Sequence, residues 1–169
     1  MLLFARTTAV LLALTAGPAL ATCPDPYPDP TVPAMTGEIT LGTKTGTHPY
    51  PFTISTIGVG GFNLRDCDLE GEGLAGYDGD GLIDTRPALV VHWRGGHPQL
   101  TITFENEADT LLLVSDPEGR WLFNDNGQDQ NPQIIIPDPT PGDYAVFVGS
   151  HGSLSFTRPG MLTISGPSP

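Results

Sequence analysis

The chain has 169 residues and a formal net charge of −12 at pH 7, and it is rich in glycine (21 residues) and proline (18 residues). Phosphate backbones and anionic lipid headgroups repel so acidic a chain, which argues against nucleic acid or a bare membrane as its partner. An apolar content of 38% argues against disorder, and the length suits about one domain with a core of its own.

Residues 1–21 have the pattern of a secretory signal peptide. Arg6 supplies the positive end, residues 9–16 form an apolar middle, and Ala19–Ala21 has the small-x-small pattern that signal peptidase cuts. The apolar run is too short for a membrane anchor, and no later run is long enough to cross a bilayer. We therefore expect a mature protein in the periplasm or the extracellular medium. There the acidity serves either solubility or the binding of a cation.

Residues 22–37 form a proline-rich lead in which proline occupies almost every second position up to Pro33. This spacing excludes a helix and a central strand, so we expect an extended segment. Cys23 in the lead and Cys67 are the two cysteines, and an exported protein keeps disulfides. A Cys23–Cys67 bridge would close a long loop and add about 3–4 kcal/mol of stability. A metal-binding or catalytic thiol is the weaker alternative, since neither cysteine has a CxxC partner or a nearby histidine in the sequence.

From Glu38 onward, apolar and polar residues alternate with the period of two that is typical of β-strands. In "QLTITFE", for example, Leu100, Ile102 and Phe104 share one face. "DTLLLVS" is apolar throughout, as a strand buried on both faces would be. About ten short strands are predicted, at residues 38–44, 51–57, 88–94, 99–105, 109–115, 120–124, 132–137, 143–149, 154–157 and 161–165.

Polar turns such as "SDPEGR" separate these strands, and no window shows sustained helical spacing. The pattern predicts an all-β fold, a jelly-roll-type antiparallel β-sandwich over residues 38–165 with a tail at 166–169. Residues 68–86 are acidic and glycine-rich without a strand pattern, so we expect them to form the largest loop of the sandwich.

The order of motifs after Asp109 resembles that of the bacterial pre-peptidase C-terminal (PPC) domain. In that family an Asp precedes an apolar strand, a "D-x-x-G" turn, an "N-D" pair, a second apolar strand and a proline–glycine turn before a tyrosine. The likeness covers residues 87–165 and extends back toward Cys67, Gly76 and Tyr77. The matching residues are Asp109, Leu111–Val114, Asp116 with Gly119, Asn124–Asp125, Asn131–Pro132, Pro141–Tyr144, Val146–Gly149 and the closing strand at 160–165.

This resemblance implies a jelly-roll sandwich without catalytic activity. Such domains usually accompany secreted proteases and aid their secretion, folding, adhesion or calcium-dependent stability. No protease domain accompanies this chain, so we expect a stand-alone module whose ligand is a protein or a polysaccharide.

Catalytic patterns are weak in the sequence. There is no G-x-S-x-G elbow, and Ser150 and His151 are neighbours that would point to opposite faces of a strand. His92 and His97 lie five residues apart across an "RGG" turn, without the ligand cluster of a zinc site. A hydrolase, such as a peptidase, with a dispersed catalytic site is the alternative function, and it requires one histidine in a pocket beside a hydroxyl or carboxylate. A structural subunit that pairs through sheet edges is a third possibility.

Calcium is the one candidate cofactor, because it prefers roughly six to eight oxygen ligands and two loops are rich in them. The stretch "GYDGDGLID" at residues 76–84 aligns with an EF-hand loop through Asp78, Asp80 and Asp84. Its first and last ligand positions, however, fall on Gly76 and Pro87. The alternative is a glycine-rich turn whose aspartates cap their own backbone.

The second loop, "NDNGQDQN" at residues 124–131, has more side-chain oxygens, and its alternative is a solvated hairpin loop. We expect it to be the better calcium site, with Asp125 as the first ligand and Asp129 as the second. The full expected set is Asn124, Asp125, Asn126, Asp129 and Asn131, with Asp109 and Asp116 approaching from neighbouring strand ends. The sequence thus predicts an exported, non-catalytic module for binding, adhesion or stability.

Overall fold

The computed structural model describes residues 27–42, 51–58, 60–67, 69–74, 77, 81–127, 131–151 and 159–166. The predicted signal peptide (1–21) and the predicted strand at 154–157 lie outside the described residues, as does Cys23. Among the described residues, no helix is long and apolar enough to span a membrane.

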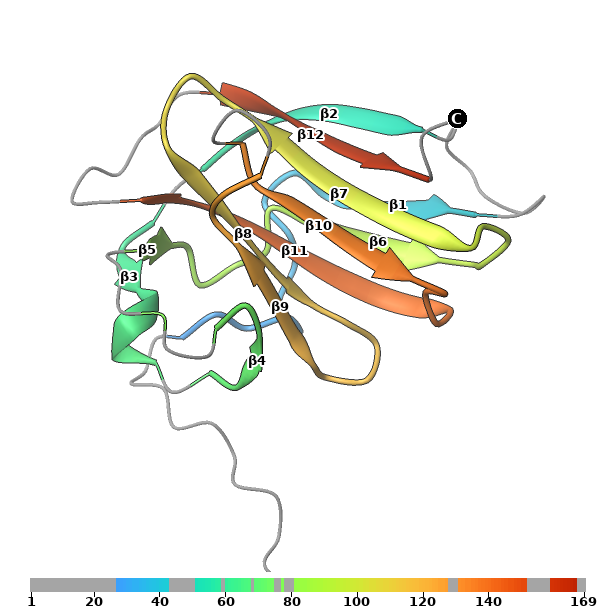
Figure 1. The fold of residues 1–169 in the computed structure, drawn as a ribbon, viewed down its shortest axis with the longest axis horizontal. Helices are drawn as coiled ribbons and strands as arrows, with labels where there is room; N and C mark the ends of the chain where they lie inside the picture. Colours follow the sequence, from blue (N-terminus) through green and yellow to red (C-terminus); the bar gives the residue numbers. More distant parts are fainter. Residues whose placement is uncertain are drawn as a thin grey trace, which may run out of the picture.

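Two β-sheets face each other in a sandwich (Figure 1), which confirms the predicted fold class. The larger sheet has the strand order β1-β6-β11-β8-β9-β4, with β5 beside β11 and β3, and the smaller sheet has the order β10-β7-β12-β2. The strands are β1 (Glu38–Leu41), β2 (Phe52–Ile57), β3 (Phe62–Asn63), β4 (Gly71–Glu72), β5 (Gly81–Ile83), β6 (Leu89–Trp93), β7 (Gln99–Glu105), β8 (Thr110–Ser115), β9 (Trp121–Asn124), β10 (Gln133–Pro137), β11 (Gly142–His151) and β12 (Pro159–Ser165), and a 3-10 helix, η1, spans Leu64–Asp66.

The chain passes from one sheet to the other repeatedly after β6. Strands β7, β10 and β12 belong to the smaller sheet, whereas β6, β8, β9 and β11 belong to the larger one. Neighbouring strands are antiparallel, apart from the parallel pairs β1–β6 and β4–β9. This alternation of sheets gives the sandwich its jelly-roll character and places sequence neighbours on opposite sides of one core.

The main core fills the space between the sheets. On β7, Leu100, Ile102 and Phe104 point inward and are fully buried, as their alternation predicts. Trp93 of β6 and Tyr144 of β11 are the largest buried side chains. The Tyr144 hydroxyl donates a hydrogen bond to the carbonyl oxygen of Thr140 at 2.9 Å, an arrangement like the tyrosine corner of Greek-key proteins. Burial is the main cause that raises the pKa of Tyr144 to about 12.

A second apolar cluster lies on the outer face of the larger sheet. Leu112 and Val114 of β8 belong to the main core, whereas Leu111 and Leu113 face outward into this second cluster, and all four are fully buried. The prediction that "DTLLLVS" is buried on both faces is therefore confirmed. Leu64, Ile83, Phe123, Ala145 and Phe147 complete the buried part of the cluster, with Phe62, Leu69, Leu74, Tyr77 and Trp121 packed against it.

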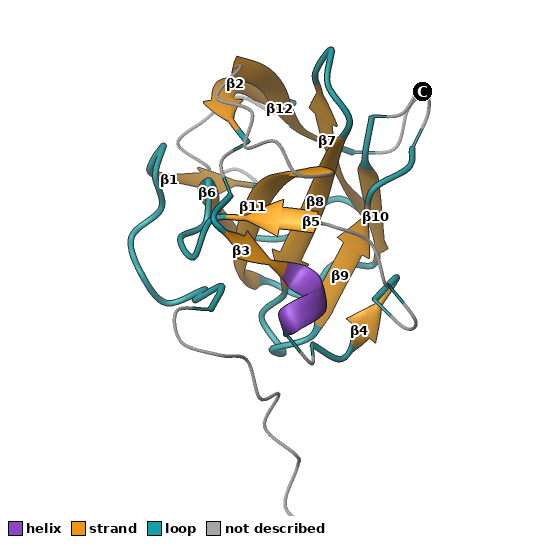
Figure 2. Ribbon diagram, turned by 90° about the vertical axis from the view of Figure 1, so that its left-hand side faces the viewer, coloured by secondary structure: helices purple, strands orange, loops and turns teal. Residues whose placement is uncertain are grey.

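Described residues of the segment 60–86, here called the covering segment, lie over this outer face. Figure 2 shows η1, β3 and β5 in front of β8 and β11. Strand β4 pairs with β9, and β5 pairs with β11. The prediction that residues 68–86 form a loop without strands is therefore wrong. Two short strands lie within that range, and they form because tertiary pairing and apolar contacts hold residues that show no alternation.

The described part of the proline-rich lead runs along the edge of the larger sheet. The backbone N–H of Met35 donates to the carbonyl oxygen of Pro87 at 2.8 Å, and that of Asp29 donates to Thr85 at 2.8 Å. Met35 also packs against the main core. The lead thus continues into β1, which pairs with β6.

Candidate functional site

The two outer faces of the sandwich differ in how they are covered. The covering segment packs on the larger sheet, whereas three exposed apolar side chains lie on the outward face of β10-β7-β12-β2, on which Thr101 is buried. Alternation directs the odd-numbered residues of these four strands outward, because their even-numbered neighbours form the core. We call this surface the open face. Of the four large apolar side chains that are more than a third exposed among the described residues, three lie on it: Ile57 (38%), Ile135 (53%) and Met161 (42%).

The strand register arranges the open face in rows. Gln133, Thr103, Thr163 and Thr53 lie side by side across the four strands. The hydroxyl oxygens of Thr53 and Thr163 are 3.1 Å apart. The next row holds Glu105, Met161 and Ser55. These rows combine hydroxyl groups with separate apolar side chains, and no outward position of the four strands carries an aromatic ring.

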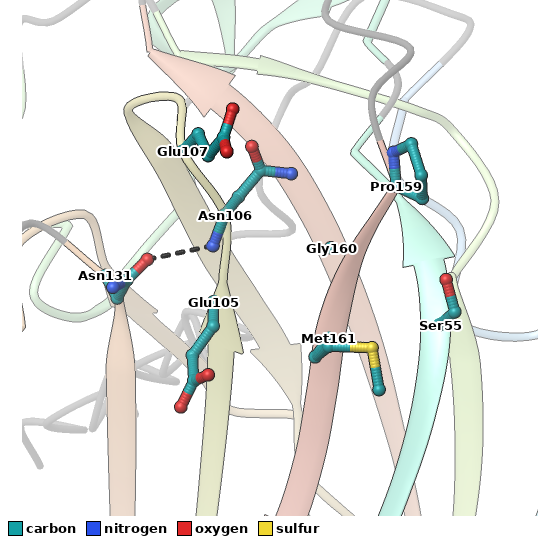
Figure 3. Close-up of a pocket in the computed structure, with 8 residues that line it drawn as sticks. All are labelled: Ser55, Glu105, Asn106, Glu107, Asn131, Pro159, Gly160 and Met161. Atoms are coloured by element: carbon teal, nitrogen blue, oxygen red, sulfur yellow. Dashed lines mark hydrogen bonds between the residues drawn. The ribbon is translucent and has the colours of Figure 1, made fainter.

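A depression of about 600 Å³ lies at one end of the open face (Figure 3). Met161 lies on its apolar side, and Glu105 and Glu107 bring two carboxylates to it. The depression is held in shape by Asn131, whose Oδ1 atom accepts a hydrogen bond from the backbone N–H of Asn106 at 3.0 Å. Asn106 Oδ1 in turn accepts from the N–H of Ala108 at 2.9 Å. The end of β7 is thus tied to the loop that precedes β10.

His92, on the outer side of the larger sheet, lies between two carboxylates. Its Nδ1 atom is 2.7 Å from Asp143 Oδ1, and its Nε2 atom is 3.1 Å from Glu38 Oε2. The hydrogen bond to Asp143 is the largest cause that raises the pKa of His92, the bond to Glu38 adds to it, and partial burial opposes both. Both ring nitrogens can donate only in the imidazolium form. In the imidazolium form, which these contacts favour, His92 links three strands.

An enzyme would require a histidine in a pocket beside a hydroxyl or carboxylate, and His92 meets this requirement only in part. The ring borders a depression of about 770 Å³ that Thr31 and Ser115 also line, and two carboxylates lie beside it. Both ring nitrogens, however, are occupied by those carboxylates, so neither is available to take a proton from a hydroxyl. Among the described residues, no hydroxyl group is hydrogen-bonded to His92.

The other two histidines of interest, His151 and His97, contact a carboxylate and an aromatic ring respectively. Ser150 is 1% exposed, whereas the side chain of its neighbour His151 is 39% exposed, as expected for residues on opposite faces of β11. His151 Nδ1 lies 3.6 Å from Asp109 Oδ2 at the surface. The His97 ring packs near Trp93 with 5.9 Å between ring centroids. This arrangement does not form a serine–histidine pair.

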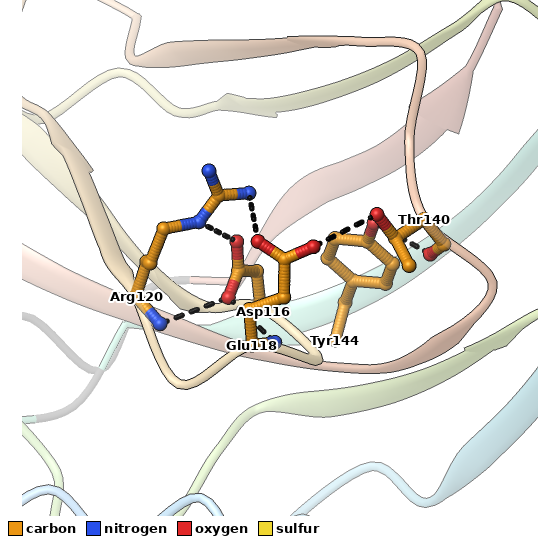
Figure 4. A network of polar contacts seen from close by, with 5 residues as sticks. All are labelled: Asp116, Glu118, Arg120, Thr140 and Tyr144. Atoms are coloured by element: carbon orange, nitrogen blue, oxygen red, sulfur yellow. Dashed lines mark hydrogen bonds and ion pairs between the residues drawn. The ribbon is translucent and has the colours of Figure 1, made fainter.

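Asp116, one of the expected calcium ligands, is instead part of a hairpin turn (Figure 4). Its side chain is 1% exposed, and Oδ1 accepts the backbone N–H groups of Glu118 at 2.9 Å and Arg120 at 2.8 Å. Oδ2 accepts from Arg120 Nε at 2.7 Å. Gly119, with φ 77°, completes the turn as "SDPEGR" predicts. The turn lies at one end of β8 and β9, and Asn124 lies at the other end of β9, so Asp116 and Asn124 are at opposite ends of this strand pair.

Several oxygens of the other expected ligands already accept hydrogen bonds. Asn124 Oδ1 accepts from the N–H of Gln133 at 3.1 Å, Asn131 Oδ1 caps Asn106, and Asp125 Oδ1 accepts from Asn126 at 2.9 Å. Asp129 lies outside the described residues. Within the described part of the chain, no group of three or more His, Cys, Asp or Glu side chains could hold a metal ion. Calcium also takes amide and backbone carbonyl oxygens, so calcium at this loop stays a prediction.

The first acidic loop lies mostly outside the described residues, including Asp78 and Asp80. Asp84 is described, and its Oδ1 atom accepts from the backbone N–H of Arg86 at 2.8 Å, as a turn-capping aspartate does. Cys67 is buried next to η1, and its N–H donates to the carbonyl oxygen of Leu64 at 3.0 Å. No described cysteine is free, but Cys23 is not described, so the Cys23–Cys67 bridge stays a prediction.

Comparison with known proteins adds little to this description. No family model matches the chain, and no curated protein matches it. Among solved structures, the chain is similar to that of Aeromonas hydrophila PliG, a periplasmic lysozyme inhibitor of g-type lysozyme, at 11% sequence identity and a TM-score of 0.38, over 76% of this chain and 96% of that one. A likeness this low carries no inference about function. The resemblance to PPC domains likewise stays a prediction.

Proposed function

We propose that the chain is an exported β-sandwich module that binds a macromolecular partner through its open face and has no catalytic role. The contrast between the two outer faces carries the proposal. The larger sheet buries Leu111, Leu113 and Phe147 under the covering segment, whereas the smaller sheet leaves Ile57, Ile135 and Met161 in solvent. These three side chains stand on one face in different rows of the register, and we infer that they contribute to an interaction surface.

Two further observations support the proposal. Residues 1–21 have the sequence pattern of a signal peptide, which favours export. Among the described residues, His92 is occupied by Glu38 and Asp143, and Ser150 and His151 face opposite ways, which favours a non-catalytic role over a serine–histidine pair at these positions.

The catalytic half of the proposal can be tested with purified mature protein. We expect casein and general peptide substrates to stay uncut. Reproducible hydrolysis that disappears in Ser150→Ala or His92→Gln would show that the alternative, a hydrolase with a dispersed site, is correct.

The binding half can be tested with methionine oxidation, since Met161 is 42% exposed on the open face and Met35 packs against the core. Dilute peroxide converts accessible methionine to the sulfoxide, which mass spectrometry measures. We expect the ratio of Met161 to Met35 oxidation rates to fall when the exported fraction of the source cells is added. Both methionines meet the same peroxide concentration, so the ratio of their rates is unaffected by peroxide that the extract consumes. An unchanged ratio would count against the open face as a binding surface.

A further inference from the structure

The open face carries negative charge without any described positive charge. Glu105 is its one charged outward residue, and Glu107 follows at its rim. The described arginines belong to the larger sheet, its connections or the covering segment. They are Arg65, Arg86, Arg94 and Arg120, of which the first, second and fourth lie within 4.0 Å of Asp66, Asp84 and Asp116 respectively.

The depression at this end of the face has the shape and chemistry to accept a long cationic side chain. Met161, Glu105 and Glu107 all line it, and Figure 3 shows the Met161 and Glu105 side chains directed to opposite sides. Lysine and arginine bury their aliphatic stems against apolar surfaces and keep their charged ends in contact with oxygen atoms. In the described residues, no cation of this chain pairs with Glu105.

Resting on the proposed function, we infer that the partner is a folded protein whose contact surface is basic. The charge of the face and the net charge of −12 both attract such a surface and speed its encounter. A polysaccharide fits less well, because the outward positions carry no aromatic ring on which a sugar could stack. A second copy of the chain fits less well too, because it would bring two acidic faces together.

The experiment measures binding of two basic proteins, cytochrome c and ribonuclease A, and of acidic ovalbumin at moderate ionic strength. We expect the mature protein to bind at least one of the basic probes and not ovalbumin. Glu105→Lys should weaken binding at least tenfold. Glu72→Lys, at an exposed position on β4 of the larger sheet, makes the same change in net charge and should alter binding less than twofold. Ile135→Ser should weaken binding at least threefold without changing the charge.

Several outcomes would overturn the inference. Equal losses in Glu105→Lys and Glu72→Lys would mean that only the net charge attracts the probe. If the chain binds neither basic protein, or if it self-associates and buries Met161, the partner of the open face is not a basic protein. The oxidation experiment separates this failure from that of the proposed function: protection of Met161 by the exported fraction, without binding of basic probes, leaves a binding module whose partner is not basic. Each variant is checked by its melting temperature, since all three positions are exposed.

Discussion

Nδ1 of His92 lies 2.7 Å from Oδ1 of Asp143, and the two residues are direct partners in the register of β6 and β11. The contact, together with the one to Glu38, raises the pKa of His92 above its unfolded value of about 6.5. A raised folded pKa means that the folded state binds the proton more tightly. The resulting stability is therefore complete below about pH 6.5 and is lost as the pH rises through the folded pKa.

We predict that His92→Asn lowers the free energy of unfolding more at pH 5.5 than at pH 8.5. The difference should be at most about 1 kcal/mol, because both carboxylates are largely exposed. Urea unfolding of wild type and variant at both pH values measures it, and the subtraction removes the pH dependence of all other groups. Equal costs at the two pH values would mean that the two carboxylates do not raise the pKa of His92.

The Asp116 turn leads to a second prediction. Its buried carboxylate accepts three hydrogen bonds, one of them from a guanidinium, so Asp116→Ala leaves two backbone donors without that acceptor. The expected loss in the free energy of unfolding is about 2–3 kcal/mol. Glu118→Gln is the control: its half-exposed side chain contacts Arg120 and Thr140 at the surface, and its loss should be below about 1 kcal/mol. A loss in Asp116→Ala no larger than that of the control would contradict this account of the turn.

The apolar patterns, alternating in β7 and continuous in β8, predicted the strands from β6 to β12 well because each has one face in the main core. They failed for β4 and β5, whose two or three residues are held by pairing with β9 and β11 rather than by their own pattern. The open face was missed for a different reason. Alternation identifies Ile135 and Met161 as facing away from the core residues, but it does not show which outer face the rest of the chain covers. Asp116 lies at the end of the β8–β9 hairpin opposite to Asn124, and sequence order does not show at which end of a hairpin a residue lies.

A third prediction tests whether the covering segment is an integral part of the domain. Leu111 and Leu112 are adjacent and both fully buried, but Leu112 faces the main core and Leu111 faces the covering segment. We expect Leu111→Ala and Leu112→Ala each to cost about 2–5 kcal/mol. If denaturant unfolding shows a loss below about 1 kcal/mol for Leu111→Ala alone, the covering segment does not bury that face in solution.

The calcium prediction ranks the two acidic loops. Any rise in melting temperature in millimolar CaCl₂ relative to EGTA should be lost in Asp125→Ala and kept in Asp80→Ala, because strands β9 and β10 fix the ends of the loop 124–131. Asp116→Ala is a further test: it should lower the melting temperature equally with and without calcium, since Asp116 lies at the other end of the hairpin. A calcium effect lost only in Asp80→Ala would assign the site to the loop 76–84, and no effect in wild type would leave both loops as turns.

The last prediction concerns the link between the proline-rich lead and the covering segment. Cys67 follows η1 directly, and no described cysteine is free; Cys23 is the one other cysteine in the sequence. A bridge between them would close a loop that contains β1, β2 and β3, and it would thereby hold the covering segment and the lead together. Intact-mass analysis after thiol blocking should show no alkylated cysteine in the native exported protein and two after reduction.

Cys23→Ser should then lower the free energy of unfolding by about 3–4 kcal/mol, chiefly because the unfolded chain gains conformational entropy without the bridge. Reduction should have the same effect on wild type and none on the variant, and two alkylated thiols in the native protein would show that the bridge does not form.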